Sequence, residues 1–189
     1  DLPRDIYNQL EQIDRNAENM RVPPLPEGSD LDSKSGKSEI DLIVQMELIK
    51  LQKIYPHITF KSKLSCPSSY VAIHPQWLRR LLRHYLINAE KNMPHEKQNP
   101  VITVSSILKD EKIEIYIEDN GNGIPPKIEA MIFKSPVPRS GGQGMGLMLA
   151  AFLAEIHRGK AWIEWNIPGT GVCFAFSIPI VKTVKEERK

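Results

Sequence analysis

The sequence predicts an α+β domain in which helices and a mixed sheet form two layers. Three observations predict it: apolar side chains recur at helical spacing over residues 76–93, apolar and polar side chains alternate over 112–119, and helix-like and strand-like patterns intermingle along 39–181. The chain has 189 residues, enough for one well-buried domain and a shorter accessory segment.

The first part of the chain is predicted to lie outside this domain. In residues 1–22, apolar side chains alternate at spacings of four and three, which is typical of the seam of a helix packed on other helices: Ile6, Leu10, Ile13, Ala17 and Met20. Such a helix could equally fold back on its own domain, and the sequence leaves both arrangements open. Residues 23–38 are rich in Pro, Gly, Ser and Asp and are predicted to be a linker. Residues 182–189 form a charged tail.

Within residues 39–181 the patterns predict helices and strands in an intermingled order. The expected helices are 40–51, 76–93 and 145–157, and the expected strands are 58–64, 101–107, 112–119, 161–165 and 172–180. The helix over 145–157 is apolar nearly all round except at Glu155, so we expect it to be buried.

Composition excludes several classes of protein. No apolar run approaches the roughly 18 residues that a membrane span requires, and a net charge of +2 provides no basic field for nucleic acid. The two cysteines, Cys66 and Cys173, lie far apart, which favours free thiols in a reducing compartment. The chain begins with Asp and has no signal-peptide pattern, so we expect it to be a piece of a longer protein.

Two apparent phosphate-binding signatures fail in their details. "SGKS" at 35–38 lacks the glycine that a P-loop needs five residues before its Gly-Lys pair, because Leu31 stands there. "GGQGMGL" lacks the third small residue of a dinucleotide fingerprint, because Leu147 stands there, and prolines replace the preceding strand.

The helix predicted over 76–93 carries polar side chains on a second face. Its apolar stripe should pack on the sheet: Leu78, Leu81, Leu82, Tyr85, Leu86, Ala89 and Met93. On the neighbouring face, His84, Asn88, Lys91 and Asn92 recur at helical spacing. These could form a solvated face, but an amide oxygen is also a ligand for Mg²⁺, and an ammonium group one turn away suits the phosphates that such an ion holds.

A carboxylate ends the strand predicted over 112–119. In "IEDNGNGIP", Asp119 is followed by Gly121 and Gly123. A buried carboxylate needs a hydrogen-bond donor, such as the exocyclic amine of adenine, and glycines allow the backbone to approach a flat base. Taken alone, "DNGNG" is more often an ordinary turn.

The order of these motifs along residues 39–181 resembles the ATP-binding domain of sensor histidine kinases, in the superfamily shared with gyrase, a mismatch-repair ATPase and a heat-shock chaperone. The resemblance implies a Bergerat-type fold, with a mostly antiparallel sheet and helices on one face, that binds ATP with Mg²⁺. It also implies a protein histidine kinase, which donates the γ-phosphoryl group to a histidine on a dimerisation domain absent from this chain and acts upstream of a response regulator.

The family pattern assigns roles residue by residue. "HYLINAEKN" is similar to the N box, which makes His84 and Asn88 the catalytic residues and Asn88 the metal ligand. "DNGNG" is similar to the first glycine box, with Asp119 on adenine; Phe133 would anchor a lid, and "GGQGMGL" is similar to the second glycine box. The nucleotide-binding residues that the resemblance implies are Asn88, Lys91, Asn92, Asp119, Gly121, Gly123, Ile124, Phe133, Arg139, Gly142, Gln143, Gly144, Met145, Gly146 and Leu147.

Three departures from the family pattern stand out. The lid is short and has one basic residue, Arg139. His74 stands where many relatives carry Asp, and a helix-capping role is its simplest interpretation. "HEKQNP" at 95–100 partly matches the phosphoacceptor box but departs at Gln98 and precedes a strand, so we expect a solvated loop there.

Two other functions remain open at this stage. Hydrolases and ATP-gated clamps of the superfamily resemble one another in a glutamate base four residues before the metal-binding Asn; His84 occupies that position here, which favours a kinase. A non-catalytic interaction module is the other alternative. The helix over residues 4–20 resembles the second helix of a dimerisation hairpin. We expect a cytoplasmic domain with no membrane or nucleic-acid contact of its own, whether or not the parent is membrane-anchored.

Overall fold

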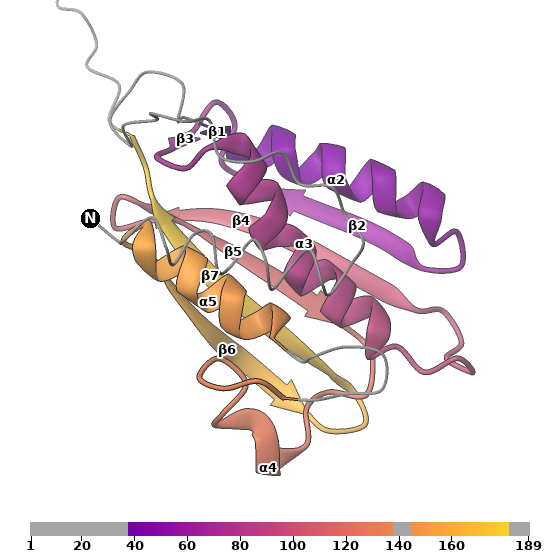
Figure 1. Cartoon of the computed structure of the whole chain (residues 1–189). Helices are drawn as coiled ribbons and strands as arrows, with labels where there is room; N and C mark the ends of the chain where they lie inside the picture. Colours follow the sequence, from indigo (N-terminus) through magenta and orange to yellow (C-terminus); the bar gives the residue numbers. More distant parts are fainter. Residues whose placement is uncertain (1–37, 138–144, 182–189) are drawn as a thin grey trace, which may run out of the picture.

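A computed structural model describes residues 38–137 and 145–181, which form two layers (Figure 1). One layer is a five-stranded sheet. Its strands, in spatial order, are β2 (Thr59–Leu64), β4 (Val101–Lys109), β5 (Lys112–Asp119), β7 (Gly171–Pro179) and β6 (Lys160–Ile167). Only β2 runs parallel to its neighbour in this sheet, and the other pairs are antiparallel. The sheet is therefore mixed and mostly antiparallel, as expected.

The second layer consists of helices on one face of the sheet (Figure 1). They are α2 (Ile40–Ile54), α3 (Pro75–Lys91) and α5 (Gly146–Ile156). The predicted stripe of α3 is buried from Leu78 to Ala89, whereas Met93 lies beyond the end of the helix and is partly buried. The Tyr85 ring stacks on Phe176 of β7 at a centroid distance of 5.4 Å. Burial of these large apolar side chains between helix and sheet is the dominant favourable contribution to folding.

Some short elements carry no periodic pattern, and the sequence did not predict them. Strands β1 (Ser38–Glu39) and β3 (Tyr70–Val71) pair with each other, and α4 (Pro126–Glu129) is a single turn. His74 caps α3 as predicted, because its Nδ1 accepts a hydrogen bond from the Gln76 amide at 3.3 Å.

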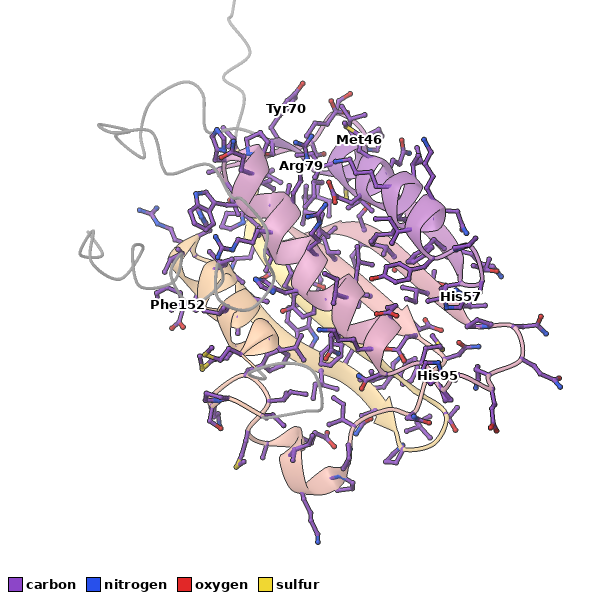
Figure 2. The ribbon with its side chains drawn as sticks, turned by 45° about the vertical axis from the view of Figure 1, so that its right-hand side comes forward. Met46, His57, Tyr70, Arg79, His95 and Phe152 are labelled. Atoms are coloured by element: carbon purple, nitrogen blue, oxygen red, sulfur yellow. The ribbon has the colours of Figure 1, made fainter. Side chains whose placement is uncertain are left out.

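Helix α5 is less buried than its composition predicts. Leu147, Leu149, Ala150 and Leu153 are buried, but the opposite side, which includes Phe152, is half-exposed (Figure 2). The expectation of full burial was wrong because α5 lies at one side of the helical layer and meets neighbours on only part of its circumference (Figure 1).

Several predicted features lie outside the described residues: the helix within 1–22, most of the linker, the lid residues 138–144 and the tail 182–189. Cys66 and Cys173 are both buried and free, as predicted. The segment 95–100 is a loop between α3 and β4, and His95 is exposed there, as expected (Figure 2). Among the described residues, no helix is both long and apolar enough to cross a membrane.

Candidate functional site

The end of β5 and the end of α3 meet through backbone contacts. The Asn122 amide donates to the Asn92 carbonyl at 3.2 Å. A Cβ atom at Gly121 would lie 2.8 Å from that same carbonyl oxygen, so the turn can pack this closely only with glycine at 121. This contact brings the "DNGNG" turn beside the helix that carries the predicted polar face.

The other side of the turn is held by Asn166 of β6. Its Oδ1 accepts from the Ile124 amide at 2.8 Å, and its Nδ2 donates to the Ile124 carbonyl at 2.9 Å. Gly123 has a φ of +66°, and a Cβ there would lie 2.8 Å from the Ile167 carbonyl oxygen. Sequence reasoning missed Asn166, since a lone Asn in a strand carries no signal of such a role.

Asn120 joins the same turn to the start of β4. Its Oδ1 accepts from the Val101 amide at 2.8 Å, and its Nδ2 donates to the Asn99 carbonyl at 3.0 Å. Asn120 and Asn166 therefore hold the turn from two sides.

Asp119 is the buried carboxylate of the site, with only 1% of its surface exposed. Its Oδ1 accepts from the Gly121 amide at 2.9 Å, whereas Oδ2 is buried and accepts no hydrogen bond of ordinary length from the described residues. Desolvation raises the pKa of this carboxyl to about 6, although the amides of Gly121 and Val172 partly offset it. Apart from the more distant Val172 amide, the described protein atoms thus provide no donor for this acceptor.

The predicted polar face of α3 divides into a buried and a more open part. His84 is buried, and a Cβ at Gly146, the first residue of α5, would lie 3.3 Å from its Nδ1. Desolvation, and secondarily the Arg80 charge, lowers the pKa of His84 to about 3, so its imidazole is neutral. Towards the end of the helix, Asn88 and Asn92 are half-buried and Lys91 is exposed.

Both ends of the predicted lid are attached to the domain. Phe133 lies edge-on to Phe174 of β7, with ring centroids 6.0 Å apart, and Leu147 is buried at the start of α5. Met145 and Gly146 are half-buried beside it. The remaining predicted lid residues lie outside the described part of the chain: Arg139, Gly142, Gln143 and Gly144.

The donor set fits a weakly held hard cation better than a resident structural metal. No group of three or more His, Cys, Asp or Glu side chains within 38–137 and 145–181 could hold a metal ion. An amide oxygen such as that of Asn88 is a typical single protein ligand for Mg²⁺, which keeps several waters and binds substrate phosphates.

The chain belongs to the family of histidine kinase-, DNA gyrase B-, and HSP90-like ATPases, because the model of that family matches residues 73–182. The matched region contains α3, both glycine-rich segments and β4–β7. This establishes the domain as an ATPase-type domain of that family, and its curated relatives include sensor histidine kinases.

Two of these relatives illustrate the likeness. The sensor histidine kinase MtrB of Mycobacterium tuberculosis is 30% identical over 112 residues, which are 56% of this chain and 19% of MtrB. The adaptive-response sensory kinase SasA of Parasynechococcus marenigrum is 26% identical over 141 residues, which are 70% of this chain and 36% of SasA. The chain thus spans about a fifth to a third of these relatives.

Solved structures share the fold. The mycobacterial sensor histidine kinase MprB superposes with a TM-score of 0.68 at 21% identity, covering 79% of this chain and 99% of the MprB chain. Full-length ShkA in complex with AMPPNP gives a TM-score of 0.67 at 20% identity, covering 78% of this chain and 31% of ShkA.

Burial of Asp119 predicts that the site lowers the stability of the fold. A carboxyl whose pKa rises from 3.8 to about 6 on folding contributes most favourably to stability below pH 4, and this contribution is lost as the pH rises through about 6. We therefore expect Asp119→Asn to raise the free energy of unfolding at pH 7 by about 1–3 kcal/mol. Urea titrations of both proteins at pH 4 and pH 7 measure this; an equal difference at the two pH values would contradict it.

Proposed function

We propose that this domain binds Mg-ATP with Asp119 on the adenine amine and donates the γ-phosphoryl group to a histidine of a dimerisation domain outside this chain. The observation that carries the adenine assignment is the buried Oδ2 of Asp119, which accepts no hydrogen bond of ordinary length from the described residues. A buried acceptor without a donor is costly, and an N–H donor from a ligand would relieve that cost.

The surroundings of Asp119 support a flat, amine-bearing ligand. Gly121 lies next to it and carries no side chain, and Ile124 is completely buried in the same turn. The Gly121 amide holds Oδ1 in place, so the carboxylate is oriented before the ligand arrives. Pre-orientation of this kind reduces the ordering cost of binding.

We assign the phosphates to the residues at the carboxyl end of α3. The amide oxygen of Asn88 would serve as a magnesium ligand, and Lys91 and Asn92, three and four residues further along α3, would contact phosphate oxygens. The amino end of α5 adds a partial positive charge. When bound, Mg²⁺ would neutralise phosphate charge and fix the geometry for phosphoryl transfer.

His84 has a positioning role in this proposal. Its imidazole is buried and neutral, with a pKa of about 3, which makes it a poor base for activating water. Its close approach to Gly146 instead supports the first turn of α5 beside the lid. The absence of a strong base at this position favours transfer to a histidine over hydrolysis.

The wider function is inferred by analogy with the relatives. MtrB is named a sensor histidine kinase, and the ShkA structure holds AMPPNP. By that analogy the parent of this chain acts in the cytoplasm on a response regulator, with the acceptor histidine supplied by its dimerisation domain. None of this requires nucleic acid or membrane contact by the domain itself.

Adenine recognition is testable at Asp119. Asp119→Ala removes the acceptor and should weaken ATP and adenosine binding by about 1–3 kcal/mol, measured by calorimetric titration. Glu118→Ala is the matched control, because Glu118 is the exposed neighbour on the same strand and should leave the affinity unchanged. Binding by the unsubstituted chain should also weaken as the pH falls below about 6. Equal affinities of Asp119→Ala and Glu118→Ala for ATP would contradict the assignment of Asp119 to adenine.

The metal role is testable at Asn88. Asn88→Leu should abolish the dependence of ATP affinity on Mg²⁺, while adenosine still binds, because the adenine end is untouched. Glu90→Gln, on the opposite side of α3, is the control. If ATP binding by Asn88→Leu keeps its ordinary response to added Mg²⁺, Asn88 is not the ligand.

Phosphoryl transfer is testable with γ-labelled ATP. The chain alone should label itself very little, because its described histidines lie in no acceptor helix. Addition of the parent's complete dimerisation hairpin should produce acid-labile, base-stable labelling, as expected of phosphohistidine. The positioning of the γ-phosphate by Asn88 and Lys91 supplies the catalysis in this proposal.

A control addresses the "HEKQNP" loop. Strong labelling of the chain alone, lost in His95→Ala, would overturn the assignment of the acceptor to another domain. Labelling that requires the hairpin and survives His95→Ala would support it.

A further inference from the structure

The face of the sheet opposite the helices carries large aromatic side chains. Helices α2, α3 and α5 lie on one face, and no described helix or strand covers the other, which we call the open face (Figure 1). There Tyr116 of β5 and Trp162 of β6 flank Ala175 of β7, and their rings meet edge to face at 6.1 Å. Trp165 lies beside Cys173 on the same face. Because Tyr and Trp are enriched at the centres of protein interfaces, the open face has the composition of a docking surface.

Exposed charges of opposite sign occupy different parts of the open face. Lys61 and Lys63 are exposed on β2, an edge strand of the sheet. Glu118 is exposed on β5, and Glu164 is exposed at the irregularity in the pairing of β6 with β7. Burial, and secondarily the charges of Glu118 and Glu164, raises the pKa of the Cys173 thiol to about 12. The face is therefore positive along β2 and negative around Cys173.

The strand register aligns these charges in rows that cross the sheet. One row consists of Lys61, Thr103, Glu118, Cys173 and Trp165, and the next consists of Lys63, Ser105, Tyr116, Ala175 and Trp162. In the row beyond, Glu114 and Lys160 flank Ser177, so their charges offset each other. Each of the first two rows thus has a lysine at its β2 end, three strands away from β7.

We propose that the open face binds the same face of a second copy of this chain, about a two-fold axis that runs along the strands between β4 and β5. Rotation about such an axis keeps each row in place and exchanges its ends. Strands β2 and β7 are equally far from the axis, so Lys61 of each copy faces Cys173 of the other. There its ammonium group lies between the carboxylates of Glu118 and Glu164. The face thus complements its own charge pattern, as a two-fold interface requires.

The aromatic centre of the open face suits the second lysine. By the same rotation, Lys63 faces Ala175, between the Tyr116 and Trp162 rings, to which an ammonium group is attracted. The chain already makes such a contact on this face, because the Lys160 ammonium lies 4.8 Å from the centroid of the Trp162 ring. Sheets that pack face to face are about 10 Å apart, a distance that these long side chains span. The arrangement involves no nucleotide, so it stands apart from the proposed function.

Sedimentation velocity of the 189-residue chain over a range of concentrations tests the proposal. We expect a reversible dimer that weakens at high salt, because salt screens exposed charges. Lys61→Glu combined with Lys63→Glu should raise the Kd of the dimer about tenfold or more, since like charges then face each other. Glu118→Lys combined with Glu164→Lys should raise it similarly.

A mixture of these two reversed chains makes the test decisive. Each reversed chain complements the other, so the mixture should form dimers that neither forms alone. Lys53→Glu combined with Lys127→Glu is the matched control: it changes the net charge of the chain equally, at exposed residues of α2 and α4, and should leave the Kd unchanged.

The results that would overturn the proposal are equally specific. They are an unsubstituted chain that stays monomeric at every concentration, a dimer that survives both reversals, or a mixture of the reversed chains that stays monomeric. Unchanged circular-dichroism spectra of the variants would show that lost association does not reflect lost folding.

Discussion

The close approach of backbone to backbone at Gly121 is the constraint on which the rest of the site depends. The turn after β5 and the last turn of α3 touch through main-chain atoms, with no side chain between them. Strand β5 is central in the sheet, and α3 is the central helix. The contact between them therefore holds the polar side chains at their ends in fixed positions relative to the core. A methyl group at position 121 would push the two elements apart and separate Asp119 from Asn88.

Two buried ionisable groups show how the same desolvation acts in opposite directions. It raises the pKa of Asp119 and lowers that of His84, so burial disfavours the charged form of each side chain. The consequences differ because their surroundings differ. Asp119 retains an acceptor atom, Oδ2, that no donor within 38–137 and 145–181 reaches at ordinary hydrogen-bond length, as expected of a group that binds a ligand. His84 is enclosed between α3 and the first residue of α5, as expected of a group that supports packing.

The sequence predicted the long elements well because their apolar residues are periodic. The α3 stripe and the alternation in β5 each reflect one buried face. Such a period can be recognised in the sequence without knowing which element packs against that face. The adenine assignment required Asp119 to be buried, and it is, because it continues the buried face of β5 after Ile115 and Ile117. Neither β1 nor β3 was predicted, since two residues cannot display a period.

What the sequence could not predict depends on contacts between distant residues. Asn166 forms a hydrogen bond with the Ile124 backbone, 42 positions away in the sequence, and the residues around Asn166 do not indicate that role. The partial exposure of α5 could not be predicted either, because composition shows how apolar a helix is but not how many other elements pack around it. Glu47 of α2 is buried because Arg79 and Arg83 of α3 pair with it, and the sequence around Glu47 does not indicate these partners.

The connectivity of the sheet also bears on how this family can diversify. Strands β5 and β7 are neighbours in the middle of the sheet, yet the turn, α4, the lid and α5 all lie between β5 and the β6–β7 hairpin in sequence. The hydrogen bonds of the sheet therefore do not depend on the length of the inserted stretch, and lengthening it would cost little entropy. A segment inserted at this point, such as the predicted lid, can therefore change in length or charge during evolution with little effect on the pairing of the sheet.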